Sequence, residues 1–168
     1  MALTVEDGTG YANADSYVSV AEADGYHSAL GNEAWAAIEP GRKEVLLRRA
    51  TNYISDVYRT AFAGAPAKAG QSLAWPRIPQ TVLERPLVPL ASVPRGVREA
   101  TIELALIADK TELLPNPKRL KKSVKIGPLA VEYADEPSGE KFVAASLKLA
   151  ANLRPIAGNP FMARVVRV

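Results

Sequence analysis

Apolar residues recur at helical spacing over residues 42–58 of the chain, and polar or charged residues occupy most of the positions between them. The apolar positions are Leu46, Ala50, Tyr53, Ile54 and Val57. This spacing is typical of an amphipathic helix that buries one side against a core. We therefore predict a helix from about residue 42 to residue 58.

A second segment, residues 95–114, is apolar on almost every side of a helix. Its apolar positions are Val97, Ala100, Ile102, Leu104, Ala105, Leu106, Ile107 and Ala108. Pro94 precedes the segment and Pro115 follows it, and prolines at these places mark the start and end of helices. This segment is predicted to be the buried central helix.

Two shorter helices are expected near the ends of the chain. Ser19 and Glu22 have the spacing of a capping box, in which each side chain bonds the backbone of the other. A helix should follow to about Leu30, where Gly31 and Asn32 tolerate the left-handed backbone that ends helices. The last helix is expected over about residues 141–153.

The remaining segments are extended or irregular. Residues 118–126 and 129–133 flank Gly127 and Pro128, which predicts a β-hairpin with one basic strand. Six prolines over residues 61–94 predict a long irregular connection. Residues 1–15 are rich in glycine, aspartate and asparagine, so they form either an ordered loop or a mobile arm.

These segments together predict a mainly α protein, a bundle of about four helices with a β-hairpin near residues 123–134. An N-terminal extended arm covers residues 1–15, a helical domain residues 16–154 and a C-terminal tail residues 155–168. The chain has 168 residues, 48% hydrophobic and 23% charged, which is the composition of one globular domain with a packed core.

Composition and charge exclude several classes of function. There are no cysteines, which rules out disulfides, zinc-thiolate sites and thiol nucleophiles. No apolar run approaches the roughly 20 residues that span a bilayer, and no secretory signal opens the chain, so neither a membrane span nor secretion is expected. A net charge of +3 favours an anionic neighbour without indicating a dedicated nucleic-acid binder.

Residues suited to catalysis are few. His27 is the single histidine, and a lone histidine is more often a surface or half-buried side chain than part of a site. Glu99 and Glu103 lie one helical turn apart and can do acid–base work, but they more often pair with Arg95 or Arg98. The chain has no phosphate-binding loop. We therefore expect a protein that is not an enzyme, with no catalytic residues, cofactor or metal.

A concentrated group of positive charges precedes and enters the predicted hairpin. Its members are Lys118, Arg119, Lys121, Lys122 and Lys125. They can contact the phosphates of DNA, where each contact adds salt-dependent affinity. They can equally be a solvated strand edge, where lysines discourage pairing with other chains. The group contains no aromatic residue for base stacking, and Tyr133 is the nearest one.

The C-terminal tail has the composition of a binding segment. It follows Pro155 and Pro160 and carries apolar and basic residues: Phe161, Met162, Arg164, Val165, Val166, Arg167 and Val168. A β-prone free end can add a strand to another subunit or fill a groove in it. A frayed terminus is usually small and polar. We therefore expect these seven residues to bind a partner protein.

Several stretches, in order, resemble a family of phage and prophage proteins, the DnaT-like single-stranded-DNA-binding proteins. They are MALTVEDGTG at 1–10, ANADSYVSVAEAD at 12–24, LRRATNYI at 47–54, LAWPR at 73–77, VP at 93–94 and IGPLAVEY at 126–133. The resemblance covers nearly the whole chain. It implies one function by its name, single-stranded-DNA binding in a phage replication system.

The layout of a helical domain plus a hairpin is also similar to the head-tail connector, or adaptor, proteins of long-tailed bacteriophages. That similarity implies a virion neck protein, made in the host cytoplasm, that forms a homo-oligomeric ring, commonly twelvefold, around double-stranded DNA. The portal protein would lie on one side and a head-closure or tail protein on the other, with the C-terminal tail docked on the portal. The lack of catalytic motifs favours the connector, and single-stranded-DNA binding is the alternative.

Overall fold

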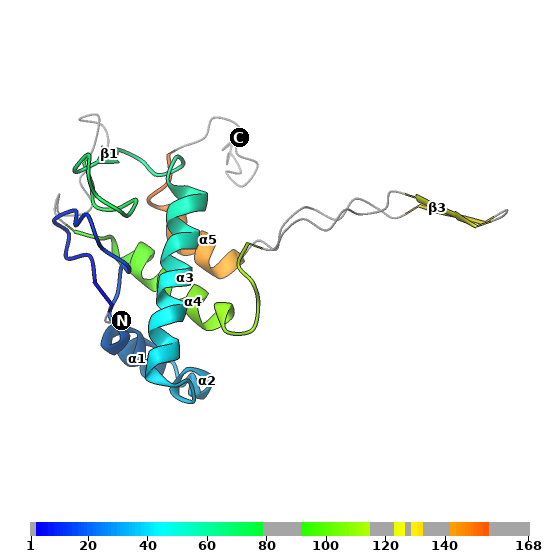
Figure 1. Cartoon of the computed structure of the whole chain (residues 1–168), viewed down its shortest axis with the longest axis horizontal. Helices are drawn as coiled ribbons and strands as arrows, with labels where there is room; N and C mark the ends of the chain where they lie inside the picture. The colour runs from blue at the N-terminus through cyan, green and yellow to red at the C-terminus, as the bar shows by residue number, and fades with distance from the viewer. Residues whose placement is uncertain (1–2, 79–91, 115–122, 127–128, 133–141, 155–168) are drawn as a thin grey trace, which may run out of the picture.

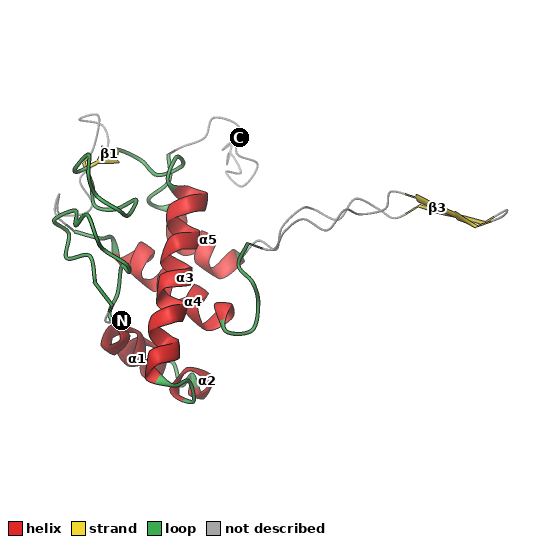
Figure 2. Ribbon diagram, viewed as in Figure 1, coloured by secondary structure: helices red, strands yellow, loops and turns green. Residues whose placement is uncertain are grey.

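The computed structural model describes residues 3–78, 92–114, 123–126, 129–132 and 142–154, with the backbone alone over 123–126 and 129–132. These residues form a mainly α structure with five helices and a small antiparallel hairpin, as the sequence predicts (Figures 1 and 2). The helices are α1 Val20–Ala29, α2 Glu33–Ala36, α3 Pro40–Tyr58, α4 Arg95–Ala108 and α5 Val143–Ala150. The strands are β1 Ala65–Pro66, β2 Arg77–Ile78, β3 Ser123–Ile126 and β4 Leu129–Glu132.

Helix α4 is the central element, because it packs against α3 on one side and α5 on another. Its buried residues recur at helical spacing, and residues of α3 and α5 that face them complete the core. Among the core residues are Leu46, Leu47, Ala50, Ile54, Val97, Ala100, Leu104, Ala105, Ala145 and Leu149. This burial of apolar surface is the main stabilising contribution to the fold.

Helix α1 begins and ends where the sequence predicts. The Ser19 hydroxyl accepts from the Glu22 backbone N–H at 3.1 Å, and the Glu22 carboxylate accepts from the Ser19 N–H at 3.3 Å, which completes the capping box. The chain leaves the helix through Gly31, whose φ of +69° suits a residue without a side chain. The single turn of α2 follows, and the sequence did not predict it.

Three helix boundaries differ from the prediction. Helix α3 starts two residues early, because Pro40 suits a first turn and the Glu39 side chain caps the Arg42 N–H. Helix α4 ends at Ala108 and not near residue 114, since the chain turns over the Ile107 carbonyl and brings Leu113 into the core.

Helix α5 is the third case, because it ends at Ala150 and not near residue 153. Beyond it the chain becomes extended. Leu153 forms an antiparallel bridge with Phe62, and the Arg154 N–H donates to the Ala61 carbonyl at 2.8 Å. These bonds compete with another helical turn, and they join the end of α5 to the segment that follows α3.

Residues 3–15 form an ordered loop, which is one of the two alternatives that their composition left open. The buried Glu6 carboxylate organises it by accepting from the backbone N–H groups of Gly8, Gly10 and Tyr11 at 2.8–2.9 Å. Gly8 and Gly10 have positive φ angles. The Ser72 hydroxyl donates to a carbonyl of the same loop, at Ala14, so the loop is tied to the domain at a second point.

The connection after α3 is irregular over residues 59–78, apart from the short pairing of β1 with β2. Arg77 holds it together. Its guanidinium is buried and donates to the backbone carbonyls of Ala63 at 2.8 Å, Gly64 at 2.6 Å and Ala74 at 3.3 Å. A charged donor group that satisfies three carbonyls replaces the hydrogen bonds that a regular element would supply.

Candidate functional site

The hairpin β3–β4 is the candidate DNA-contacting element, and it forms where the sequence predicts. Its antiparallel register runs from Ser123 opposite Glu132 to Ile126 opposite Leu129. Figure 1 shows the hairpin well apart from the five helices, on the stretch of chain between α4 and α5.

The structure places one member of the basic group. Lys125 lies in β3, opposite Ala130 in β4. Lys118, Arg119, Lys121 and Lys122 precede β3 and lie outside the described residues. The seven tail residues predicted to bind a partner, which lie between positions 161 and 168, are also outside the described residues, because these end at Arg154. Both assignments therefore stay predictions.

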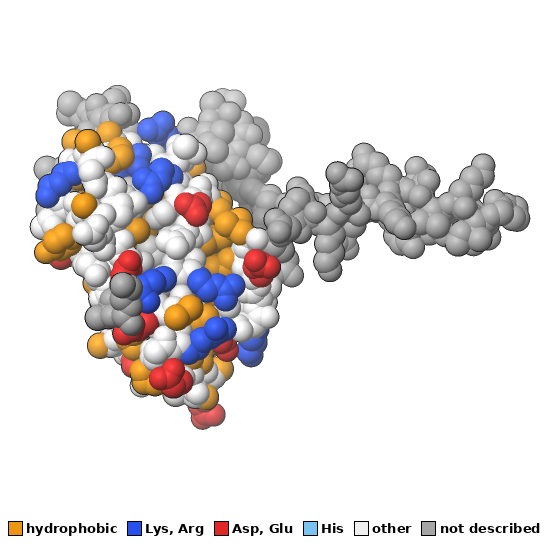
Figure 3. Space-filling model, viewed as in Figure 1, with side chains coloured by type: hydrophobic (Ala, Val, Ile, Leu, Met, Phe, Trp, Pro, Cys, Tyr) orange, Lys and Arg blue, Asp and Glu red, His pale blue; other side chains and the backbone are white. Residues whose placement is uncertain are grey.

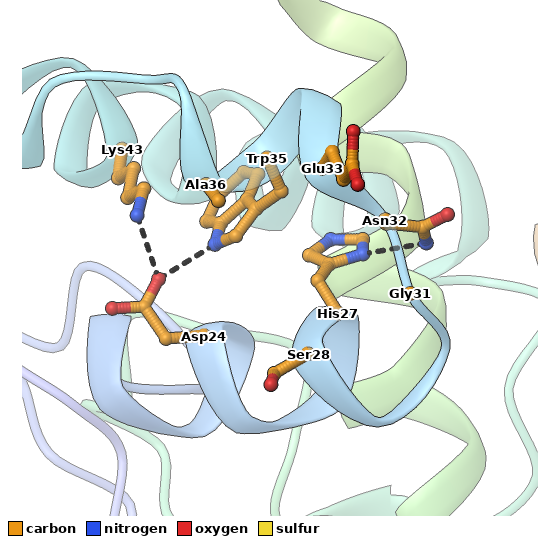
Figure 4. Close-up of a pocket in the computed structure, with 9 residues that line it drawn as sticks. All are labelled: Asp24, His27, Ser28, Gly31, Asn32, Glu33, Trp35, Ala36 and Lys43. Carbon is orange, nitrogen blue, oxygen red and sulfur yellow. Dashed lines mark hydrogen bonds and ion pairs between the residues drawn. The ribbon is translucent and has the colours of Figure 1, made fainter.

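The described residues line an open pocket of about 410 Å³ between α1, α2 and the start of α3 (Figure 4). Its lining residues are Asp24, His27, Ser28, Gly31, Asn32, Glu33, Trp35, Ala36 and Lys43. A histidine, two carboxylates, a hydroxyl and an amine in one pocket are groups that acid–base chemistry uses. The bonds they already make decide whether they are available for it.

One of the two carboxylates, Asp24, bonds to the amine of the pocket, Lys43. Asp24 accepts from the Trp35 indole N–H at 2.7 Å and from the Lys43 ammonium at 2.9 Å. Partial burial raises the pKa of the Asp24 carboxyl, but the hydrogen bonds from Lys43 and Trp35 outweigh it and leave the pKa below its usual value. The pair joins α1 to α2 and α3, which is a structural role.

The prediction of a surface or half-buried side chain is wrong for His27, because only 1% of its area is exposed. Its ring packs against Trp35 at a centroid distance of 4.8 Å, and Nδ1 lies 3.0 Å from the Asn32 amide nitrogen. Burial lowers the pKa of the imidazole, which favours the neutral ring. Nε2 is buried and has no hydrogen-bond partner among the described residues. These contacts favour a packing role for His27.

Glu99 and Glu103 of α4 are held by cations. The Lys148 ammonium lies 2.8 Å from Glu99 and 3.4 Å from Glu103, and Arg95 also pairs with Glu99. The hydrogen bond from Lys148 lowers the pKa of the Glu99 carboxyl. The Tyr26 hydroxyl donates to Glu103 at 2.6 Å. The predicted pairing with Arg95 is confirmed.

Two partners of this carboxylate pair escaped the sequence analysis. Arg98, the other predicted partner, instead pairs with Glu22 of α1 at 2.9 Å. Lys148 and Tyr26 are far from α4 in the sequence, so no spacing rule points to them. The side chains of Glu99, Glu103, Lys148 and Tyr26 pair with one another. Such mutual pairing is typical of a structural network and not of a free acid–base pair.

The described residues contain no group of three or more histidine or carboxylate side chains that could hold a metal ion. None of their helices combines the length and the apolar character that crossing a membrane requires.

Comparisons with known proteins returned one match. A family model with the description "Putative DnaT-like ssDNA binding protein" matches residues 1–168, the whole chain. No curated protein sequence matches the chain, and no solved structure matches it.

Proposed function

The chain belongs to the DnaT-like ssDNA-binding protein family, and from this membership we propose that it binds single-stranded DNA through the hairpin β3–β4 and the basic segment that leads into it. The family match favours this function over the head-tail connector that the sequence analysis preferred. The proposed contacts are Lys118, Arg119, Lys121, Lys122 and Lys125.

The position of the hairpin is the observation that carries this proposal. It lies apart from the five helices (Figure 2). A two-stranded hairpin alone is marginally stable in water. An element that lies apart from the helices, and that a bound ligand would stabilise, is suited to contact with such a ligand.

The chemistry of the contact would be mainly electrostatic. Lysines that neutralise phosphates release counterions, so affinity falls with salt by a slope of about 0.7 per contact on single strands. Base stacking would need an exposed aromatic ring. In the described part of the chain, Tyr11 is the one aromatic residue exposed by more than a third, at 49%. Tyr133 directly follows β4 and remains the nearest candidate beside the hairpin.

The test uses the full chain and a labelled thymidine oligonucleotide, followed by fluorescence anisotropy at several salt concentrations. Lys121→Ala/Lys122→Ala/Lys125→Ala should weaken binding by roughly tenfold or more near 0.1 M salt. A control with the same loss of charge is Arg42→Ala/Arg95→Ala/Arg98→Ala, because these arginines pair with carboxylates on the helical body. Absence of binding by the unmodified protein at low salt would contradict the proposal.

A second candidate is the head-tail connector, and exposed apolar residues on α5 favour it. Val143 and Leu147 are 65% and 71% exposed, one helical turn apart. Exposed apolar residues next to one another are typical of surfaces that contact another protein. A ring subunit needs such a surface for its neighbour, and a hairpin held away from the body can reach that neighbour or the DNA channel.

In this candidate function the chain forms a ring, commonly twelvefold, in the virion neck, around passing double-stranded DNA. The portal protein would bind the tail residues from Phe161 to Val168, and a head-closure or tail protein would bind the opposite side. Deleting residues 159–168 should abolish binding to purified portal and leave the monomer folded, as judged by circular dichroism. Electron microscopy of neck complexes distinguishes the two functions, because a connector occupies a ring beneath the portal.

A further inference from the structure

Three arginines from distant parts of the sequence meet beside the β1–β2 loop. Arg77 and Arg154 both donate to the same carbonyl oxygen, that of Gly64, at 2.6 and 3.3 Å. Arg59, which directly follows α3, donates to the Ser72 carbonyl of the same loop at 3.0 Å. The backbone pairing of residues 61–63 with residues 152–154 is what brings Arg154 to this place.

No carboxylate forms an ion pair with this cluster within the described residues. Asp56 lies one helical turn before Arg59 but is not paired with it, and residues 57–78 and 142–154 contain no aspartate or glutamate. Burial lowers the pKa of the Arg77 guanidinium, and the positive charges of Arg154 and Arg59 lower it further. Figure 3 shows Lys and Arg side chains at the end of the molecule that carries β1, and others among Asp and Glu side chains over the rest of the same face.

The three arginines differ in how many of their guanidinium N–H groups already donate a hydrogen bond to the loop. Arg77 is 8% exposed and uses Nε, Nη1 and Nη2 on loop carbonyls, so it is a structural residue that also supplies charge. Arg59 and Arg154 are exposed, and each has one side-chain hydrogen bond to the loop. A guanidinium has five N–H donors, so both keep donors that point to solvent or to a ligand.

An unused donor lies in the same loop. The Trp75 indole Nε1 is buried and has no hydrogen-bond partner among the described residues. The Trp75 ring packs on Phe62, whose neighbours Ala61 and Ala63 bond the backbone of Arg154 and the side chain of Arg77. Donors and positive charge are therefore in excess of acceptors in this part of the structure.

We propose that Arg59 and Arg154, supported by the buried charge of Arg77, form a phosphate-binding patch that contacts the phosphodiester backbone of a nucleic acid. Arginine suits this ligand because its planar donor fork matches two phosphate oxygens. The choice of nucleic acid rests on the proposed function, whereas the patch is separate from the hairpin β3–β4. It adds a phosphate contact on the helical body.

The test compares the full chain with Arg59→Gln/Arg154→Gln. Glutamine keeps a donor for the loop carbonyls and removes the charge, and Arg77 stays intact to preserve the loop. The control Arg42→Gln/Arg98→Gln removes the same charge from arginines that pair with Asp109 and Glu22. Anisotropy titrations use a thymidine oligonucleotide and a DNA duplex, and thermal melts establish that each variant is folded.

We expect the patch variant to lose roughly tenfold or more in affinity near 0.1 M salt, and its salt slope on the single strand to fall by about 1.4, two contacts at about 0.7 each. The control should change much less. Equal losses in both variants, or an unchanged patch variant, would overturn the patch and leave single-strand binding standing. Binding of the duplex alone, weakened by the patch substitutions, would support the patch and overturn the proposed single-strand function. If neither probe binds the unmodified chain, both proposals fall.

Discussion

Lys148 and Arg154 lie six residues apart at the end of the chain's described part, yet their surroundings are opposite. The Lys148 ammonium lies between the carboxylates of Glu99 and Glu103, which raise its pKa. The Arg154 guanidinium shares a carbonyl with Arg77. The first cation is paired with carboxylates, and the second has no carboxylate partner among the described residues. The net charge of the chain therefore does not indicate which cations are available to an anionic ligand.

Replacing Gly96 should have the largest effect on the free energy of unfolding, because it disturbs the contact of α4 with α5. Lys148 lies in α5 and Arg154 follows it, so the surroundings of both cations depend on this contact. A Cβ at this position would lie 2.3 Å from the Lys148 backbone oxygen, so the backbone of α5 would have to move. Gly96→Ala is expected to lower the free energy of unfolding by about 2–3 kcal/mol, measured by urea denaturation.

Gly25→Ala is the matched control for this substitution. Gly25 lies in α1, and a Cβ there meets nothing within 4 Å. Alanine has the higher helix propensity, so this variant should gain up to about 1 kcal/mol. A Gly96→Ala protein as stable as the unmodified chain would contradict the close approach of α4 and α5.

A direct comparison of the two cations should give the next largest effect. Lys148→Met keeps much of the side chain's length but leaves two partly buried carboxylates without this cation, so it should cost about 1–2 kcal/mol. Arg154→Gln should change stability by no more than about 0.5 kcal/mol, since its guanidinium is exposed and has no carboxylate partner among the described residues. Equal costs in urea denaturation would remove the distinction between the two sites.

The pH dependence of Glu99→Gln sharpens the description of the compensated site. The hydrogen bond from Lys148 lowers the pKa of Glu99 from its ordinary value of 4.5. The ionised carboxylate therefore stabilises the fold above pH 4.5, and this contribution is lost as the pH falls through the lower pKa of the folded state. Thermal melts should show Glu99→Gln less stable than the unmodified protein at neutral pH, with a gap that narrows below pH 4.5. A gap independent of pH would contradict this.

The smallest expected effect concerns the uncompensated site. Inorganic phosphate that binds the folded state should stabilise the unmodified protein by about 0.4 kcal/mol when its concentration equals its dissociation constant. Arg59→Gln/Arg154→Gln should lose this gain, and Arg42→Gln/Arg98→Gln should keep it. Thermal melts in phosphate and in chloride at equal ionic strength measure the difference, and equal gains in all three proteins would argue against a phosphate site.

Local features of the sequence predicted the hairpin and every described helix except α2. The capping box of Ser19 and Glu22, the apolar spacing of α3 and α4 and the Gly127–Pro128 turn each act over a few residues. The ends of α4 and α5 were predicted too late in the sequence. In each case, tertiary contacts that a helical pattern does not contain replaced the last turns: the burial of Leu113 and the pairing of Leu153 with Phe62.

The candidate sites divide in the same way. The basic group around Lys125 was visible in the sequence, because its members are consecutive or nearly so. The arginine patch was not visible, because Arg59, Arg77 and Arg154 are separated by up to 95 positions and each looks ordinary alone. Two stretches without aspartate or glutamate, residues 57–78 and 142–154, were the one available signal, and they become informative only once the chain is folded.

By itself, the sequence determined the mainly α composition, the place of the hairpin and the resemblance that the family match bears out. These depend on local propensity, periodicity and short motifs. Only the tertiary structure decided which cations are compensated, that His27 is buried and that Gly64 receives two guanidiniums. The physical reason is that electrostatic environment depends on distance in space, and packing brings together groups that the sequence keeps apart.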